Sequence, residues 1–117
     1  CPAGWRVPEG GSNGVWSKAL GSNSSFTQSS LYDSANEGMN FSGKFGADQI
    51  IWYPTSGYRE GLDGGLGTVG SSGRYWSASP DDDYGSYLYF NYNGFVSPSD
   101  SDGRAHGLSV RCLQESK

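Results

Sequence analysis

The chain has 117 residues, a formal net charge of −4 and a pI near 4.7, with 19 Gly and 15% aromatic residues. This charge argues against a nucleic-acid partner, and no apolar run approaches the roughly 20 residues of a membrane span. The length fits one domain, residues 1–117, in which short strands and turns surround an aromatic core. Because the chain begins at Cys1, without Met or a leader, we expect either a mature product or the C-terminal module of a longer protein.

The first expected elements are a short strand and a helix. The run CPAGWRVP at 1–8 predicts an edge strand, because apolar and charged residues alternate before a proline ends the run. Ser12 or Asn13 is expected to cap a helix that continues to Leu20, and Gly21 is expected to stop it.

The middle of the chain gives weaker signals. Residues 31–38 allow a second short helix, and residues 50–53 form an apolar run that predicts a core strand ending at Pro54. Residues 61–73 read as a glycine-rich loop, and residues 75–79 as a further strand.

The clearest alternation in the chain lies near residue 90. Leu88 and Phe90 fall on one face of a predicted strand, and Tyr87, Tyr89 and Asn91 fall on the other. We expect the first face to be core and the second to be exposed.

The last predicted strand closes the domain. Val96 continues the core pattern, and residues 108–113 predict a strand with Leu108 and Val110 on one side. Short antiparallel strands, one or two short helices and long irregular loops make the predicted fold class α+β.

The two cysteines, Cys1 and Cys112, lie at the two ends of the chain. Our first interpretation is a disulfide, which in the chain-entropy model contributes about 4 to 5 kcal/mol for such a loop. The alternative is a pair of unpaired buried thiols in a reducing compartment. No CxxC spacing exists and His106 has no neighbours at ligand spacing, so neither a metal site nor a cofactor is predicted.

The segment from 80 to 106 is rich in Tyr, Asn, Ser, Asp and Gly, and it lies between the sequences GRYWSAS and GLSVRC. These residue types are typical of evolved binding surfaces. Residues 77–110 also lack Lys, Glu, Gln, Met and Trp, the five types that adenine changes in an asparagine codon cannot reach. This pattern indicates adenine-directed mutation, although turn chemistry also enriches Asn, Asp, Ser and Gly.

Three motifs suggest other activities, but the residues around each motif lack what that activity requires. Gly65, Gly67 and Gly70 spell GxGxxG, but no helix is expected to follow. Residues 81–83 are aspartates without the spacing of a calcium loop. His106 could act as a base only with an oriented nucleophile, and no nucleophile-elbow pattern occurs. We therefore do not expect an enzyme.

Four blocks occur in order over nearly the whole chain: CPAGWRVP at 1–8, YPTSGYRE at 53–60, TVGSSGRYWSAS at 68–79 and GRAHGLSVRC at 103–112. Together they resemble the Fibrobacter succinogenes major paralogous domain and the overlapping variable proteins of diversity-generating retroelements, from Bacteroidetes or their phages. The resemblance implies a C-type-lectin-like fold in which the N- and C-terminal strands lie close together, and a disulfide between the two cysteines fits that closure.

The resemblance also divides the binding segment into fixed and variable positions. It implies a fixed frame at Leu88, Phe90, Val96, Pro98, Arg104, Ala105 and Gly107. It implies diversified positions at Tyr89, Asn91, Tyr92, Asn93, Gly94, Phe95, Ser97, Asp100, Ser101, Asp102, Gly103 and His106. The predicted ligand-binding residues are Tyr84, Tyr87, Tyr89, Asn91, Tyr92, Asn93, Phe95, Ser97, Asp100, Ser101, Asp102 and His106.

We therefore expect a ligand-binding module, a receptor or adhesin, on the bacterial cell surface or a phage tail tip. Its expected partner is a protein or glycan receptor on another cell. The main alternative is an adhesive tip domain of a bacterial surface protein, with fixed specificity for carbohydrate or protein and no retroelement. The EPN, QPD and WND triplets of sugar-binding C-type lectins are absent, so calcium-dependent sugar binding is not expected. The sequence leaves the oligomeric state open.

Overall fold

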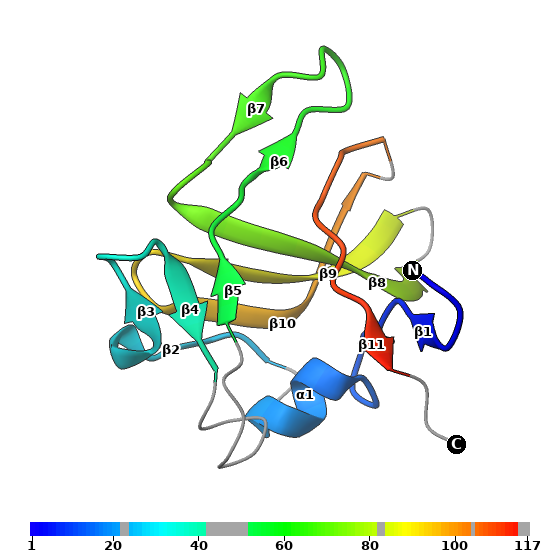
Figure 1. Cartoon of the computed structure of the whole chain (residues 1–117), viewed down its shortest axis with the longest axis horizontal. Coiled ribbons are helices and arrows are strands. Elements are labelled where there is room, and N and C mark those ends of the chain that lie inside the picture. The colour runs from blue at the N-terminus through cyan, green and yellow to red at the C-terminus, as the bar shows by residue number, and fades with distance from the viewer. Residues whose placement is uncertain (22–23, 42–51, 82–83, 104, 115–117) are drawn as a thin grey trace.

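The computed structural model describes residues 1–21, 24–41, 52–81, 84–103 and 105–114. Over these ranges, mostly antiparallel strands combine with one α-helix and one short 3-10 helix, which fits an α+β or mostly-β class (Figure 1). The elements are β1 (Trp5–Arg6), α1 (Val15–Leu20), β2 (Phe26–Thr27), η1 (Ser29–Leu31), β3 (Tyr32–Asp33), β4 (Gly38–Asn40), β5 (Trp52–Pro54), β6 (Tyr58–Arg59), β7 (Leu66–Gly67), β8 (Ser72–Asp81), β9 (Tyr84–Asn91), β10 (Phe95–Gly103) and β11 (Leu113–Gln114).

The main sheet has the strand order β2-β10-β9-β8 and contains the three longest strands. As the alternation predicts, Leu88, Phe90 and Val96 are fully buried on one side of it. The register shifts twice, between Trp76 and Pro80 in β8 and between Ser97 and Asp100 in β10. Such bulges bend a strand and increase its local twist.

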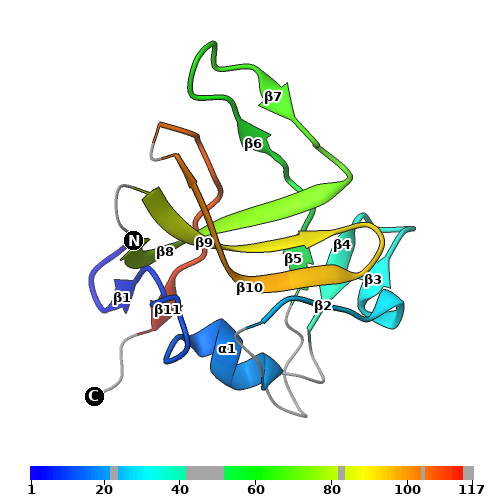
Figure 2. The same ribbon diagram turned by 180° about the vertical axis from the view of Figure 1, so that it is seen from behind.

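A second layer covers the buried side of the main sheet. It consists of the β3-β4-β5 sheet and α1. β5 lies in front of β8 and β9 in Figure 1 and behind them in Figure 2, which is the opposite view. The aromatic rings of Phe41, Tyr53, Tyr75 and Phe90 meet between the layers, mostly edge to face, with centroids 4.8 to 6.5 Å apart. All four rings belong to the hydrophobic core. Aromatic pairs of this geometry stabilise the fold beyond the contribution of their buried area.

The two tyrosine hydroxyls in this core have hydrogen-bond partners. The Trp16 indole N–H donates to Tyr53 Oη at 3.1 Å, and Tyr75 donates to the Pro54 carbonyl at 2.8 Å. Burial raises the pKa of both Tyr53 and Tyr75 above the ordinary value for tyrosine. The hydroxyls therefore stay neutral and bonded, as buried polar groups require.

The predicted first helix forms, but it begins later than expected. Its N-cap is Gly14 in extended backbone, with no side-chain cap, so neither Ser12 nor Asn13 has that role. Gly14 is buried, and a Cβ there would lie 2.3 Å from the Glu9 carbonyl oxygen, so only glycine fits this start. Gly21 ends the helix at φ 74°, which confirms the predicted stop.

The second predicted helix, over residues 31–38, is wrong. This segment contains only the end of η1, and β3 and β4 then form a hairpin. The Asp33 carboxylate accepts hydrogen bonds from the backbone of Ala35 and from both the side chain and backbone of Asn36, and these bonds lower its pKa. The Asx turn at Asp33 therefore outcompetes helix formation, as such side chains often do.

Two further strand predictions are met in part. Residues 75–79 lie within β8, and the glycine-rich segment 61–73 contains β7 and the start of β8 as well as a loop. The core strand expected at 50–53 appears as β5, while residues 50 and 51 lie outside the described ranges.

The closing strand expected at 108–113 is wrong over most of its length. Only Leu113 and Gln114 pair as a strand, with β1, and Ser109 makes a single bridge to Tyr75. Val110 is 51% exposed, so Leu108 and Val110 do not form a core face. The segment instead follows the outer edge of β8, where Trp76 donates its backbone N–H to the Ser109 carbonyl.

The expected disulfide between Cys1 and Cys112 is confirmed, with the two Cα atoms 5.8 Å apart. It lies beside the β1-β11 pair, so the first and last strands lie close together as expected. The cross-link and the strand pair together hold the two ends of the described chain on one side of the molecule (Figure 1).

Replacing both cysteines with serine should lower the free energy of unfolding by about 2 to 5 kcal/mol. The cause is that the unfolded chain then gains the freedom that a 111-residue cross-link removes. Urea unfolding followed by circular dichroism measures the change. Two alkylated thiols in native, unreduced protein would contradict the disulfide itself.

The two faces of β9 should respond differently to truncation. Phe90→Ala should cost about 3 to 5 kcal/mol, because it leaves a cavity among buried aromatic rings. Tyr89→Ala is the matched control from the other face, where the side chain is only half-buried, and it should cost clearly less. Equal losses in urea unfolding would show that the two faces are not core and display surfaces.

Candidate ligand-binding face

The strand register gathers many of the predicted ligand-binding residues on the side of the main sheet that faces away from the core. Trp76 lies opposite Tyr87, and Arg74 lies opposite Tyr89, so all four side chains share this side. We call this side the binding face. Its residues are Arg74, Trp76, Tyr87, Tyr89, Asn91, Phe95, Ser97 and Asp100. Figure 2 shows the main sheet from this side, with β9 and β10 in front of β5.

Arg74 is the centre of the binding face. Its guanidinium carbon lies 4.0 Å from the ring centroid of Tyr58, 5.4 Å from that of Tyr89 and 5.8 Å from that of Tyr87. Each such cation–π contact contributes about 0.5 to 1 kcal/mol where partly exposed. One cation therefore contacts three rings from two strands, β6 and β9. Sequence patterns did not reveal this role because β6, β8 and β9 are separate segments of the chain.

Tyr87 corrects one expectation about the face. It is only 4% exposed, because the Trp76 ring packs against it at a centroid distance of 5.9 Å. It is therefore unavailable to a ligand and supports the residues around it. Trp76 itself is half-buried and belongs to the binding face rather than to the central core.

The exposed aromatic residues of the hairpin are spread along its length. Tyr89 packs edge-on against Phe95, with centroids 5.9 Å apart, and both are half-buried. Tyr84 is 54% exposed at the start of β9, and Tyr92 is 59% exposed in the turn that follows it. Since β9 has 8 residues, these two tyrosines lie about 25 Å apart.

The turn between β9 and β10 has a structural role that sequence reasoning missed. The Asn91 side-chain oxygen accepts the backbone N–H of Asn93 at 3.0 Å and that of Phe95 at 3.4 Å. Gly94 has φ 81°, and a Cβ there would lie 2.5 Å from the Cα of Ser29. A side chain at position 94 would therefore strain the turn, which argues against its place among the diversified positions, and Asn91 is constrained by the same turn.

One further predicted residue, Ser101, lies away from the others. Ser101 pairs with buried Ser86, so it points to the opposite side from Asp100. Arg104 and the side chain of Asp102 lie outside the described part of the structure, as do Asp82 and Asp83. The binding face thus contains a subset of the predicted ligand-binding residues.

The β6-β7 hairpin and residues 105–107 form a wall beside the face, and both views show them side by side (Figures 1 and 2). Arg59 and Gly107 exchange two backbone hydrogen bonds of 2.8 and 3.0 Å. The Gly61 N–H donates to His106 Nδ1 at 3.1 Å, and the His106 ring packs edge-on against Tyr58. His106 therefore braces the wall, and its Nδ1 accepts a hydrogen bond within it.

The described residues provide no grouping of three or more His, Cys, Asp and Glu side chains that could hold a metal ion. Over the same residues, no helix has the length and apolar character needed to cross a membrane. Compared with known proteins, the chain matches no family model, no curated protein and no solved structure. What bears on its function is therefore the geometry of the binding face and its wall.

Two glycines that the sequence assigned to the diversified set should differ sharply when replaced. Gly94→Ser should cost more than about 2 kcal/mol, since the left-handed backbone alone costs about 1 to 2 kcal/mol and the new Cβ overlaps neighbouring backbone. Gly103→Ser is the control, because a Cβ there meets only the His106 ring, at 3.4 Å. It should change stability by no more than about 0.5 kcal/mol.

Thermal and urea unfolding of the two variants measure this difference. A Gly94→Ser variant as stable as Gly103→Ser would show that a side chain is tolerated at position 94 after all.

Proposed function

We propose that the chain is a ligand-binding module with a C-type-lectin-like fold, which displays a variable surface on β9, β10 and their turn. The observation that carries the proposal is the placement of Tyr89, Phe95, Ser97 and Asp100 on one side of the main sheet, away from the core. Backbone hydrogen bonds hold that sheet, so the outward side chains can change without changing the strand pairing.

The chemistry of the face suits a receptor or adhesin. Tyrosine gives a large contact area at low entropic cost, and hot spots of binding energy are enriched in Tyr, Trp and Arg. Arg74 and Trp76 come from the fixed part of the sequence and lie among the variable residues. They supply a constant anchor, and Asp100 adds a charge that affects association rate and choice of partner.

The fold assignment is supported by the joined ends of the chain and by the four sequence blocks that resemble this family. A disulfide is typical of an oxidising compartment, which favours a location on the bacterial cell surface or a phage tail tip. The partner we propose is a protein or glycan receptor on another cell, bound without a metal cofactor and without chemical conversion.

The proposed source of variation is a retroelement. It is supported by the absence of Lys, Glu, Gln, Met and Trp from residues 77–110. Sequencing the DNA that flanks the gene tests this part: a reverse transcriptase and a near-identical template repeat are expected. If neither is found, the adhesive domain of fixed specificity becomes the better explanation.

A display library tests the binding face without knowledge of the natural ligand. Tyr89, Tyr92, Asn93, Ser97 and Asp100 are randomised on the surface of yeast, and the cells are selected with lysozyme as the target. We expect most members to fold, as judged by resistance to protease, and binders with dissociation constants of about micromolar or better to emerge. Binding should persist in EDTA.

The control library randomises five exposed positions outside the face: Ser12, Ser25, Ser30, Ser34 and Ala35. It should retain folding and give few binders. If the two libraries give equal numbers of lysozyme binders, or if randomising the face unfolds most members, the proposal is wrong.

A further inference from the structure

A pocket of about 480 Å³ lies beside α1, on the core side of the main sheet and away from the binding face. Four segments of the chain contribute to it: β1, the loop that follows β1, α1 and β11. The lining residues are Arg6, Glu9, Asn13, Val15, Lys18, Ala19 and Leu113. No feature of the sequence indicated this pocket, because its walls come from opposite ends of the chain.

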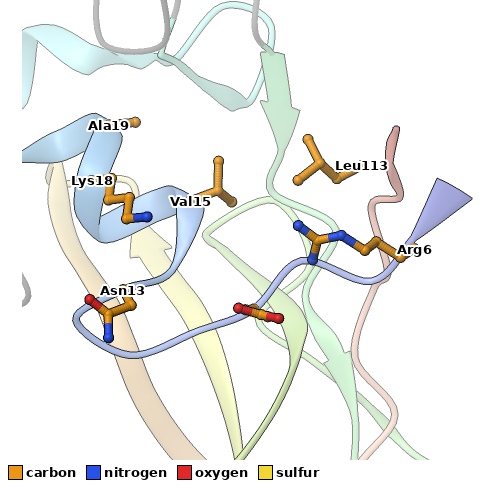
Figure 3. A pocket seen from close by; sticks show the side chains of 7 residues that line it. Arg6, Asn13, Val15, Lys18, Ala19 and Leu113 are labelled. Carbon is orange, nitrogen blue, oxygen red and sulfur yellow. The ribbon is translucent and has the colours of Figure 1, made fainter. Parts of the chain in front are cut away.

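The pocket has a net positive charge. Arg6 and Lys18 are its two cations, and Glu9 is its one acid. Figure 3 shows Lys18 extending from α1 and Arg6 extending from β1 into the space between the two elements. Within the described part of the chain, neither cation takes part in a hydrogen bond or an ion pair. Both charges are therefore available to a ligand.

The pocket also has an apolar side and a fixed shape. Val15, Ala19 and Leu113 are half-buried, and Val15 packs against the core. Arg6 and Leu113 are direct partners in the β1-β11 pair, which lies beside the Cys1–Cys112 cross-link. A site held in this way loses little conformational freedom when a ligand binds.

We propose that this pocket binds a carboxylate that carries a compact apolar group, presented by a free acid or by the C-terminal residue of a peptide. Arg6 binds the carboxylate through its fork of N–H donors, and Lys18 adds a second charge. The apolar group lies against Val15, Ala19 and Leu113. Glu9 repels negative charge, so it disfavours ligands of higher negative charge. Removing its charge should therefore strengthen the binding of a carboxylate.

Two-dimensional amide NMR spectra test the proposal, with isocaproate as the probe. The signals of residues 15–19 and of Leu113 should shift and saturate, with a dissociation constant of about 1 mM. Acetate lacks the apolar group, and isocaproamide lacks the charge. Each should bind more weakly than isocaproate by roughly tenfold or more.

Three exposed charges provide matched variants whose folding is checked by thermal melting. Arg6→Gln should weaken isocaproate binding roughly fivefold, the scale of one partly exposed charge-assisted contact. Glu9→Gln should strengthen binding, because it removes a repulsive charge. Arg59→Gln, in the β6-β7 hairpin outside this pocket, should leave binding unchanged.

Absence of saturation, or equal binding of isocaproate and isocaproamide, overturns the proposal. So does an equal effect of Arg6→Gln and Arg59→Gln. A parallel titration with acetyl-Gly-Gly-Leu identifies the source of the carboxylate: tighter binding than isocaproate assigns the site to peptide C-termini, and weaker binding assigns it to free acids. These results do not depend on the binding face.

Discussion

The buried side chain of Tyr53 connects more parts of this molecule than any other contact described above. Its ring meets Phe41, Tyr75 and Phe90 edge to face, and its hydroxyl accepts the indole N–H of Trp16. On another side, the Arg111 guanidinium lies 4.5 Å from its ring centroid. The helix, both sheet layers and the segment before the disulfide thus converge on one ring, so the position of β9 depends on this cluster.

The molecule uses arginine in two similar ways on the two sides of its main sheet. Arg111 lies on Tyr53 in the core and donates to the Trp52 carbonyl, whereas Arg74 lies on Tyr58 at the binding face. Each planar cation lies over an aromatic ring, a geometry that leaves its N–H groups able to donate to oxygen atoms. The difference lies in the surroundings: the first joins elements of the scaffold, and the second lies among side chains that a partner can reach.

Some features of the structure could be predicted from the sequence and others could not, for physical reasons that differ from one element to the next. The period-two pattern around Phe90 identified the central strand and its buried side, and the terminal cysteines identified the cross-link. The helix expected at 31–38 failed because one carboxylate, Asp33, bonds three groups ahead of it in the chain. The burial of Tyr87 and the restriction at Gly94 depend on neighbours from other strands and loops, which no periodicity reveals.

The disulfide has a consequence for the fate of the exposed β6-β7 hairpin. Leu62 at its tip is completely exposed and lies among glycines, where proteases cut most readily. A single cut there divides the chain between Tyr53 and Tyr75, yet Cys1 and Cys112 stay bonded and the aromatic cluster joins the two pieces. The core contacts therefore hold the nicked molecule in its fold, and the disulfide keeps the two fragments covalently joined. The fragments separate on a gel only after the sample is both denatured and reduced.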